Sequence, residues 1–240
     1  MAGGVLLLDL GNRRLKAAMF RRPGGHGPVQ TWTLAESLTA LPAVAAEAAE
    51  VRLSSTNPAF LPQLLAGPLA AKKLHQAGPG NWPISVHSQG TGSDRVLAAF
   101  AAWSRNRLPC LVADLGTAWT LDVVDGSGEF RGGAIGAGLG LQEAALSEAC
   151  PHLGTAAEDL PADFARRIPE TTAQALASGL AGHLAAGLEA QAKRFEAALG
   201  QPCKRFYSGG DGPRLQFHLG PDWEGADDLV LEGLSLWAPT

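Results

Sequence analysis

The sequence has few cysteines, no long basic segment and no long apolar run, and each of these shortages argues against a class of protein. Its 240 residues include only three cysteines, Cys110, Cys150 and Cys203, which stand far apart and form no C-x-x-C pair. An odd, scattered set argues against a disulfide framework or a zinc site and is typical of a reducing compartment. The six histidines form no H-E-x-x-H pattern, which adds to the case against zinc.

Charge and hydropathy are those of an ordinary core-forming protein. The chain is 46% hydrophobic and 18% charged, with a formal net charge of −4. The basic pairs 21–22 and 72–73 are too short for a nucleic-acid surface, so we expect no nucleic-acid partner. The apolar run at 5–8 is too short for a signal peptide, and no stretch approaches the ~20 apolar residues of a membrane span. We therefore expect a cytoplasmic protein with no membrane partner.

One pattern occurs twice. The segment VLLLDLGNRR, residues 5–14, is an apolar strand that ends on Asp9 and turns at Gly11. The segment CLVADLGTAWTLDVVD, residues 110–125, repeats the apolar strand and the triplet Asp-Leu-Gly, now at Asp114. Each triplet is followed by a second strand, a third strand and then helices. The spacing is too long for a solenoid and predicts two domains of one topology, at residues 1–108 and 109–240, with a ligand cleft between them.

Hydrophobic spacing predicts several further elements. The segment 93–106 places Val96, Leu97, Phe100 and Trp103 on one helical face. The segment 171–199 indicates a long helix whose many Ala and Gly positions allow another helix to approach closely. An alanine-rich helix is expected at about 42–50, and a strand at 82–88. These elements alternate strands with helices, as in an α/β protein.

The paired turns suit a phosphate chain. Glycine lets backbone N–H donors approach an anion because it lacks Cβ and tolerates positive φ. Carboxylates beside phosphate make sense if Asp9 and Asp114 hold Mg²⁺ or another cation, directly or through water. Lys16, on the strand after the first turn, is expected to face the same place. A third glycine turn at 208–212, SGGDG, would let a nucleotide base or ribose lie against the backbone.

Each of these features also has a simpler interpretation. A single D-x-G after a strand is usually only a turn, and two copies in matching hairpins favour function more strongly than one. Asp94 stands where a helix begins, and aspartate is a favoured N-cap residue. Arg95 beside it has the simpler interpretation of a surface charge. From the residues alone, these structural roles for Asp94 and Arg95 are as well supported as catalytic ones.

Taken together, the motifs resemble those of the type III pantothenate kinases, members of the sugar kinase/Hsp70/actin superfamily. They occur in the family's order over nearly the whole chain, and they are specific as a set although none is specific alone. The matching segments are DLGN (9–12), GSDR (92–95), DLGTAWTLD (114–122), GGAIGAG (132–138), TTAQALASG (171–179), SGGD (208–211) and LVLEGL (229–234). The resemblance implies two tandem actin-like (RNase H-like) domains, with mixed β-sheets flanked by helices.

The resemblance also implies how ATP and cations are held. The first turn of the family holds ATP phosphates, and Thr117 matches a nucleotide contact. Asp114 matches a position linked to a monovalent cation, commonly K⁺ or NH₄⁺, and Asp9 is the second expected metal position, with Mg²⁺ as the divalent ion. The expected ATP-binding residues are Asp9, Gly11, Asn12, Arg13, Lys16, Gly116, Thr117, Gly209 and Gly210.

On the substrate side, the resemblance implies that the G-x-D-R segment grips pantothenate and that Asp94 is the general base. Asp94 would take the proton from the primary hydroxyl as that hydroxyl attacks the γ-phosphoryl group of ATP. Arg95 would pair with the carboxylate of pantothenate. Thr172 matches a threonine that reaches the substrate from the partner subunit of a homodimer. The expected substrate-binding residues are Gly92, Ser93, Arg95 and Thr172.

Four departures from the family pattern keep other functions open. Arg13 stands where a small Thr or Ser is usual, Trp119 replaces a threonine and Ala137 replaces a proline. The stretch before Gly92 is shortened and lacks the family's tyrosine. The main hypothesis is a kinase that makes 4′-phosphopantothenate in the first step of coenzyme A synthesis. The alternatives are a degenerate paralogue, which binds a nucleotide or metabolite in a regulatory or accessory role, and a phosphohydrolase.

Overall fold

The computed structural model describes residues 4–21, 25–156 and 163–239, and the contacts of the chain divide it into two compact units. The first unit comprises Met1–Asn106, Gly128–Phe130 and Asp228–Thr240, and the second comprises Arg107–Ser127 and Arg131–Asp227. The C-terminal segment thus belongs to the unit in which the chain begins. The functional domains expected at 1–108 and 109–240 stay a prediction.

The first unit is built on a mixed five-stranded sheet. The strand order is β3-β2-β1-β4-β5, with β1 antiparallel to β2 and parallel to β4. The elements of this unit are β1 (Gly4–Leu10), β2 (Arg14–Phe20), β3 (Gln30–Thr33), α1 (Leu34–Ala46), β4 (Ala48–Ser55), α2 (Leu61–Ala66), β5 (Lys73–Gln76), α3 (Ser93–Asn106) and α8 (Leu229–Leu236).

The second unit repeats this arrangement. Its sheet has the order β10-β9-β6-β7-β8, with β6 antiparallel to β7 and parallel to β9, so β6 occupies the place of β1. The expected α/β class, with two mixed sheets flanked by helices, is confirmed. The elements are β6 (Cys110–Leu115), β7 (Ala118–Val124), β8 (Phe130–Ala137), α4 (Leu139–Ala149), η1 (Pro151–Leu153), η2 (Phe164–Arg166), α5 (Thr172–Ala177), η3 (Ser178–Gly182), α6 (His183–Leu199), β9 (Lys204–Ser208), α7 (Gly212–Leu215) and β10 (Trp223–Gly225).

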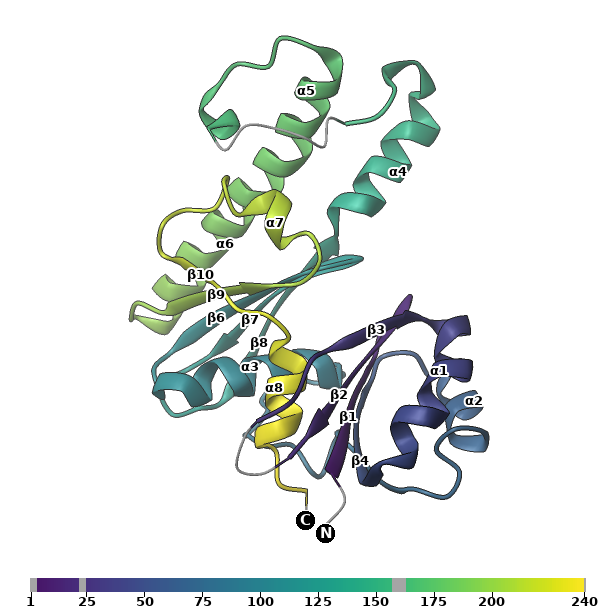
Figure 1. Cartoon of the computed structure of the whole chain (residues 1–240). Helices are drawn as coiled ribbons and strands as arrows, with labels where there is room; N and C mark the ends of the chain where they lie inside the picture. Colours follow the sequence, from purple (N-terminus) through teal and green to yellow (C-terminus); the bar gives the residue numbers. More distant parts are fainter. Residues whose placement is uncertain (1–3, 22–24, 157–162, 240) are drawn as a thin grey trace. The chain divides into compact units, whose positions relative to one another are not determined.

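The run of leucines in β1 is explained by helices on both faces of the first sheet. Successive side chains of a strand point to opposite faces. Leu6, Leu8 and Leu10 pack in a core cluster that also contains Leu41 of α1. Leu7 packs in a second cluster with side chains of α3 and α8. Helices α1 and α2 lie on one side of this sheet, and α3 and α8 lie on the other (Figure 1).

The long helix expected at 171–199 is present, and it changes its hydrogen-bonding pattern along its length. Helix α5 continues through the π-helical turn η3 into α6. The helix ends at Gly200, whose φ of 69° is the left-handed conformation that commonly terminates helices. Leu184 and Leu188 of α6 pack on the second sheet in a cluster with Leu111 of β6.

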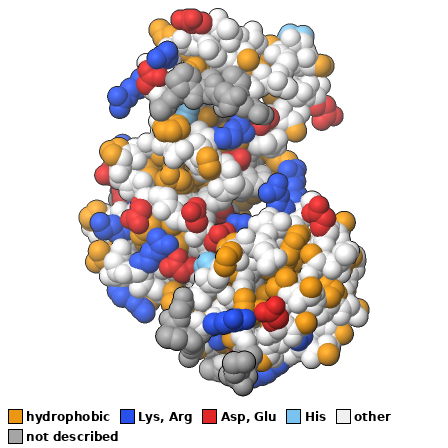
Figure 2. Space-filling model, viewed as in Figure 1, with side chains coloured by type: hydrophobic (Ala, Val, Ile, Leu, Met, Phe, Trp, Pro, Cys, Tyr) orange, Lys and Arg blue, Asp and Glu red, His pale blue; other side chains and the backbone are white. Residues whose placement is uncertain are grey.

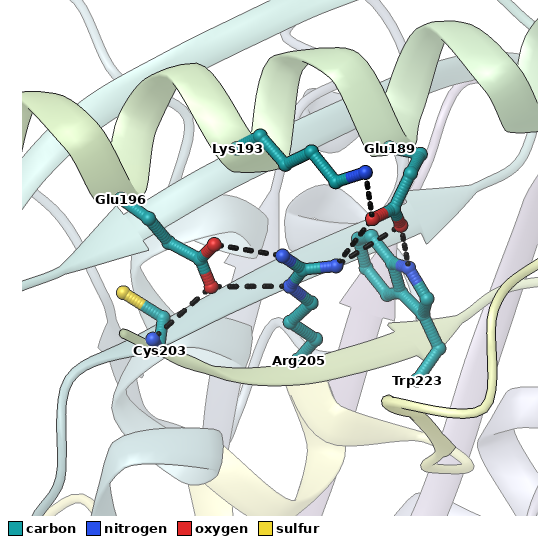
Figure 3. Close-up of polar contacts among 6 residues, drawn as sticks. All are labelled: Glu189, Lys193, Glu196, Cys203, Arg205 and Trp223. Atoms are coloured by element: carbon teal, nitrogen blue, oxygen red, sulfur yellow. Dashed lines mark hydrogen bonds and ion pairs between the residues drawn. The ribbon is translucent and has the colours of Figure 1, made fainter. Parts of the chain in front are cut away.

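A buried arginine, Arg205 of β9, connects the second sheet to α6 through ion pairs (Figure 3). Only 8% of the Arg205 side chain is exposed, and it pairs with Glu189 at 2.9 Å and Glu196 at 2.7 Å. The Trp223 indole donates a hydrogen bond to Glu189 at 3.0 Å. Hydrogen bonds from Arg205 lower the pKa of Glu196. These partners satisfy the buried guanidinium, so we assign the cluster to packing of the fold.

Two sequence expectations were wrong in detail. The helix expected at 42–50 is α1, which begins earlier, at Leu34, and has ended before β4 starts at Ala48. The strand expected at 82–88 is reduced to one bridge between Val86 and Phe130. In the described part of the chain, no helix has the length and apolar character needed to span a membrane. Acidic and basic side chains are interspersed over the face in Figure 2.

Candidate functional site

The first D-x-G segment forms the turn between β1 and β2. Asp9 lies directly opposite Lys16 in the antiparallel register, which places the two side chains on one face of the sheet. The Gly11 amide donates to the Arg14 carbonyl at 3.0 Å and closes the turn. Asp9 and Lys16 are half-buried, whereas Asn12 and Arg13 are exposed at the tip. The expected hairpin with an acidic strand end is therefore present.

Thr56 and Asn57, which follow β4, form hydrogen bonds with this turn. Because β1 and β4 are parallel, their carboxyl ends lie at the same edge of the sheet, where α/β proteins commonly bind ligands. The Thr56 amide donates to the Leu10 carbonyl at 3.0 Å, and the Asn57 side chain donates to the Gly11 carbonyl at 3.4 Å. The sequence analysis did not single out Thr56 or Asn57, since a short S-T-N segment has no specific signature.

The start of α3 is fixed at the same edge. The buried Ser93 hydroxyl lies 2.9 Å from the Ser54 hydroxyl and accepts from the Ser55 amide at 3.1 Å. A Cβ at Gly92 would lie 2.5 Å from Oδ1 of Asp94 and 3.4 Å from Cγ2 of Thr56, so a side chain there would displace the Asp94 carboxylate. The structure thus brings Asp94 beside the residues that follow β4, within the first unit.

Asp94 is electrostatically distinct from an ordinary surface aspartate. Burial raises its pKa, and the backbone amide and positive charge of Arg95 oppose that shift. The Arg95 amide donates to Oδ1 of Asp94 at 2.8 Å, which is also what a carboxylate at a helix start would accept. The Arg95 guanidinium lies 5.9 Å from the ring centre of Phe130. The geometry is therefore compatible with both a base and a helix-end acceptor.

The second unit has an equivalent edge. Asp114, the penultimate residue of β6, pairs with Thr120 across the hairpin and with Ser208 of the parallel strand β9. Gly209 adopts φ +98°, and a Cβ there would lie 2.7 Å from Oδ1 of Asp114. The Gly138 amide, just before α4, donates to the Thr117 carbonyl at 3.0 Å. Three segments distant in sequence meet here with little more than backbone between them.

Asp211, which the sequence analysis did not single out, stands at this second edge. Its amide donates to the Leu115 carbonyl at 2.9 Å. Burial raises the pKa of the Asp211 carboxyl, while the charge of Arg214 and a hydrogen bond from the Leu139 amide lower it. Leu139 is the first residue of α4, so Asp211 ties the turn after β9 to the start of that helix.

The expected site residues thus occupy three places. The first unit brings Gly11 close to Thr56 and Asn57, and Thr56 close to Gly92 and Asp94. The second unit groups Asp114, Gly116, Thr117, Gly209 and Gly210 at the edge formed by β6 and β9. Thr172 lies elsewhere in that unit, exposed at the first residue of α5, at the end of the long helix remote from the sheet (Figure 1).

These groups have the chemistry for an anionic ligand and its cation. Glycine turns offer backbone N–H donors, and half-buried carboxylates lie at both edges, those of Asp9 and Asp94 in the first unit and those of Asp114 and Asp211 in the second. Among the residues that the structure describes, no group of three or more His, Cys, Asp or Glu side chains forms a metal cage. One or two carboxylates suit Mg²⁺, which keeps several waters and takes other ligands from substrate phosphates.

Comparison with known proteins gives a consistent result. The family model described as type III pantothenate kinase matches residues 5–194. The type III pantothenate kinase of Laribacter hongkongensis is 32% identical over 96% of this chain and 97% of its own length. That of Aromatoleum aromaticum is also 32% identical, over 98% of this chain and 97% of its own.

Solved structures agree on the fold. A Campylobacter jejuni protein assigned to the Baf family of transcriptional activators has a TM-score of 0.67 at 20% identity, with 95% of this chain and 94% of that chain covered. The activator of the 2-hydroxyisocaproyl-CoA dehydratase from Clostridium difficile has a TM-score of 0.56 at 11% identity, covering 98% and 92%. At such identities the likeness concerns the fold alone, and the expected pair of actin-like domains is confirmed.

Proposed function

The chain belongs to the type III pantothenate kinase family, and we propose that it transfers the γ-phosphoryl group of ATP to pantothenate with the residues described above. The product is 4′-phosphopantothenate, and the reaction is the first step of coenzyme A biosynthesis. The observation that carries this proposal is the match to pantothenate kinases over nearly the whole length of the chain and of its relatives.

We propose that both D-x-G turns contact the nucleotide. Gly11, Asn12, Arg13 and Lys16 would hold phosphates, because the turn offers backbone donors and two exposed or half-exposed cationic side chains. Gly116, Thr117, Gly209 and Gly210 would contact ATP from the second unit. The glycine turn supports this part of the proposal, because Gly209 packs on the backbone of Leu115 and a Cβ at Gly210 would have no atom within 4 Å.

Asp94 is the proposed general base. The pantothenate hydroxyl would lose its proton to the Asp94 carboxylate as a new bond forms from that oxygen to the γ-phosphorus. The bond from the γ-phosphorus to the bridging oxygen breaks, and ADP leaves. The raised pKa of Asp94 supports this role, since a base closer to the working pH accepts a proton more readily. Gly92 and Arg95 would contact pantothenate, and Ser93 would fix the position of the segment through Ser54 and Ser55.

Cations belong to the proposal as well. Asp9 would hold Mg²⁺ together with the nucleotide, and Asp114 would hold K⁺ or NH₄⁺. Bound Mg²⁺ neutralises charge on the phosphates of ATP and favours attack at the γ-phosphorus. Thr172, which is exposed at the first residue of α5, would contact substrate in a partner subunit of a homodimer. A cytoplasmic location stays a prediction.

A coupled assay of ADP release, with pantothenate, Mg²⁺ and K⁺ present or omitted in turn, tests the proposal. We expect ADP formation that requires pantothenate and Mg²⁺ and produces 4′-phosphopantothenate, identified by mass. Equal ADP release without pantothenate would instead indicate a phosphohydrolase. Nucleotide binding without any turnover would indicate a regulatory or accessory paralogue, and would make Arg13 the first residue to replace by serine.

A further inference from the structure

A second aspartate stands at the first turn, and it comes from the opposite end of the chain. Asp228, 212 positions after Lys16, accepts a hydrogen bond from the Lys16 ammonium at 2.7 Å. We propose that Asp228 is a positioning residue, which holds Lys16 in the orientation that meets the phosphates of ATP. This inference rests on the proposed function, because it assigns a further residue to the same reaction.

The backbone of Asp228 is unusual for its place. It precedes α8 in the N-cap position, where aspartate normally accepts from a helix amide, yet its side chain makes no such bond. Its φ of 50° and ψ of 37° are left-handed, a conformation that few residues other than glycine, asparagine and aspartate adopt readily. The carboxylate is thus turned from the helix to Lys16, and such strain persists only where the surroundings enforce it.

Helix α8, which directly follows Asp228, is held firmly in the core of the first unit. Leu229, Leu231 and Leu234 are completely or almost completely buried. A Cβ on Gly233 would collide with the backbone of Leu97 in α3, which shows how closely the two helices approach. At the other end of α8, the Arg52 guanidinium donates to the carbonyls of Leu234 and Ser235, at 3.0 and 3.2 Å, and to that of Trp237.

This packing connects two parts of the proposed active site. Helix α3 carries Asp94 in its first turn, and α8 packs along α3 in the same unit. Asp228 therefore fixes Lys16 relative to the helix pair that carries the proposed base. The contact is partly open to solvent, with 36% of the Lys16 side chain and 22% of the Asp228 side chain exposed, so a ligand can reach the ammonium.

The chemistry of lysine allows the pair to persist while ATP is bound. The ammonium has three N–H donors on a flexible four-carbon stem, so one donor can stay with Asp228 while others contact phosphate oxygens. Without the Asp228 carboxylate, Lys16 would keep its positive charge, but its ammonium group would no longer be held in one position. We therefore expect Asp228 to affect the rate of phosphoryl transfer more than the binding of ATP.

The same helix provides a matched control. Glu232 of α8 pairs with Arg105 of α3 at 2.7 Å, and its side chain is 27% exposed, close to the exposure of Asp228. Glu232→Gln removes one ion pair of α8 without touching the first turn. Asp228→Asn removes the charge while keeping a side chain of the same size that also tolerates left-handed backbone.

Steady-state kinetics of five proteins test the inference: wild type, the single variants Asp228→Asn, Glu232→Gln and Lys16→Met, and the Asp228→Asn, Lys16→Met double variant. For Asp228→Asn we expect kcat to fall about tenfold with KM for ATP changed less than about twofold, and the thermal midpoint to match that of Glu232→Gln. In the Lys16→Met background, Asp228→Asn should change kcat by less than about twofold.

Two outcomes would overturn the inference alone. One is a wild type with pantothenate-dependent turnover and an Asp228→Asn variant as active as Glu232→Gln. The other is an undiminished effect of Asp228→Asn in the Lys16→Met background, which would mean that Asp228 acts independently of Lys16. A wild type without pantothenate-dependent turnover would overturn the proposed function, and this inference with it.

Discussion

At the scale of single residues, Asp94 is partly buried, although a general base must also be ionised. A base must be ionised to accept a proton, and burial opposes ionisation by removing water from the charged form. The Asp94 carboxyl is half-buried over Gly92, and the amide and charge of Arg95 offset part of the cost of burial. The carboxylate is thus kept available but less stable than it would be in water, which suits proton transfer.

Asp94→Asn should separate the catalytic from the structural role. Asparagine caps helices about as well as aspartate, so a helix-end role would survive the change. We expect turnover to fall by about 10² to 10⁴. Because the folded state raises the Asp94 pKa, the ionised form costs stability above that pKa, and the variant should be as stable as wild type or more so at neutral pH.

The pH profile provides the second readout of that experiment. In wild type, kcat/KM for pantothenate should fall as the pH drops through the raised pKa of Asp94, because protonation removes the base. Asp163→Asn, which changes an exposed carboxylate paired with Arg167, is the control and should leave the profile unchanged. Nearly full activity in Asp94→Asn would show that Asp94 is not the general base and serves only as a hydrogen-bond acceptor at the start of the helix.

Sequence reasoning found the residues of this site where they lie in short motifs. Asp9, Gly11, Gly92 and Asp94 stand in segments whose residue types already indicate turns and helix starts. Asp228 was not found, because nothing near it in sequence points to Lys16 at the opposite end of the chain. Its role depends on tertiary packing of α8, which a motif does not encode.

At the scale of elements, prediction succeeded where hydrophobic spacing and end signals agreed. Helix α3 begins and ends where its amphipathic pattern indicated. Helix α1 was misplaced because Pro42, taken as a helix start, lies inside the helix, and the true start has a capping box between Thr33 and Glu36. The strand expected at 82–88 is not formed, because the backbone hydrogen bonds of Ser85 and His87 to Phe130 make one isolated bridge and not a longer ladder.

Replacing glycine by alanine should have opposite effects on stability at the contact between α8 and α3 and on the exposed face of α6. Gly233→Ala should lower the free energy of unfolding by about 2 kcal/mol, because the new methyl group meets the backbone of Leu97. Gly187→Ala, on the exposed face of α6 with no atom within 4 Å of the new Cβ, should raise it by about 0.5–1 kcal/mol. Equilibrium urea unfolding measures both, and equal effects would mean that intrinsic helix propensity outweighs packing.

At the scale of the whole molecule, the two sheets have the same arrangement of strands although their sequences differ. In each, a central strand has aspartate as its penultimate residue, turns back into an antiparallel neighbour and has a parallel strand on its other side. The repeated D-x-G pattern was therefore sufficient to predict the repeated topology. The assignment of α8 to the first unit was not predictable, because its apolar residues suit burial against either sheet.

Ending the chain after Asp227 should affect the two units unequally. The first unit would lose Leu231, Leu234 and Trp237 from its core, and Arg52 would lose its carbonyl partners. Hydrogen exchange should then become fast in β1, β2 and β4, while β6 and α6 keep their protection. Leu236→Ala, at a side chain that is 48% exposed, is the control and should leave both units protected. Equal loss in both units would show that they unfold as one.

Because α8 belongs to the first unit, that unit is begun before the second unit is translated and completed after it. Strands β1 to β5 emerge early, but the helix that covers one face of their sheet is translated only after the entire second unit. At synthesis rates of about 5–20 residues per second, that delay is on the order of ten seconds. Throughout that delay, the apolar side chains of the sheet and of α3 that α8 later covers would lack this partner.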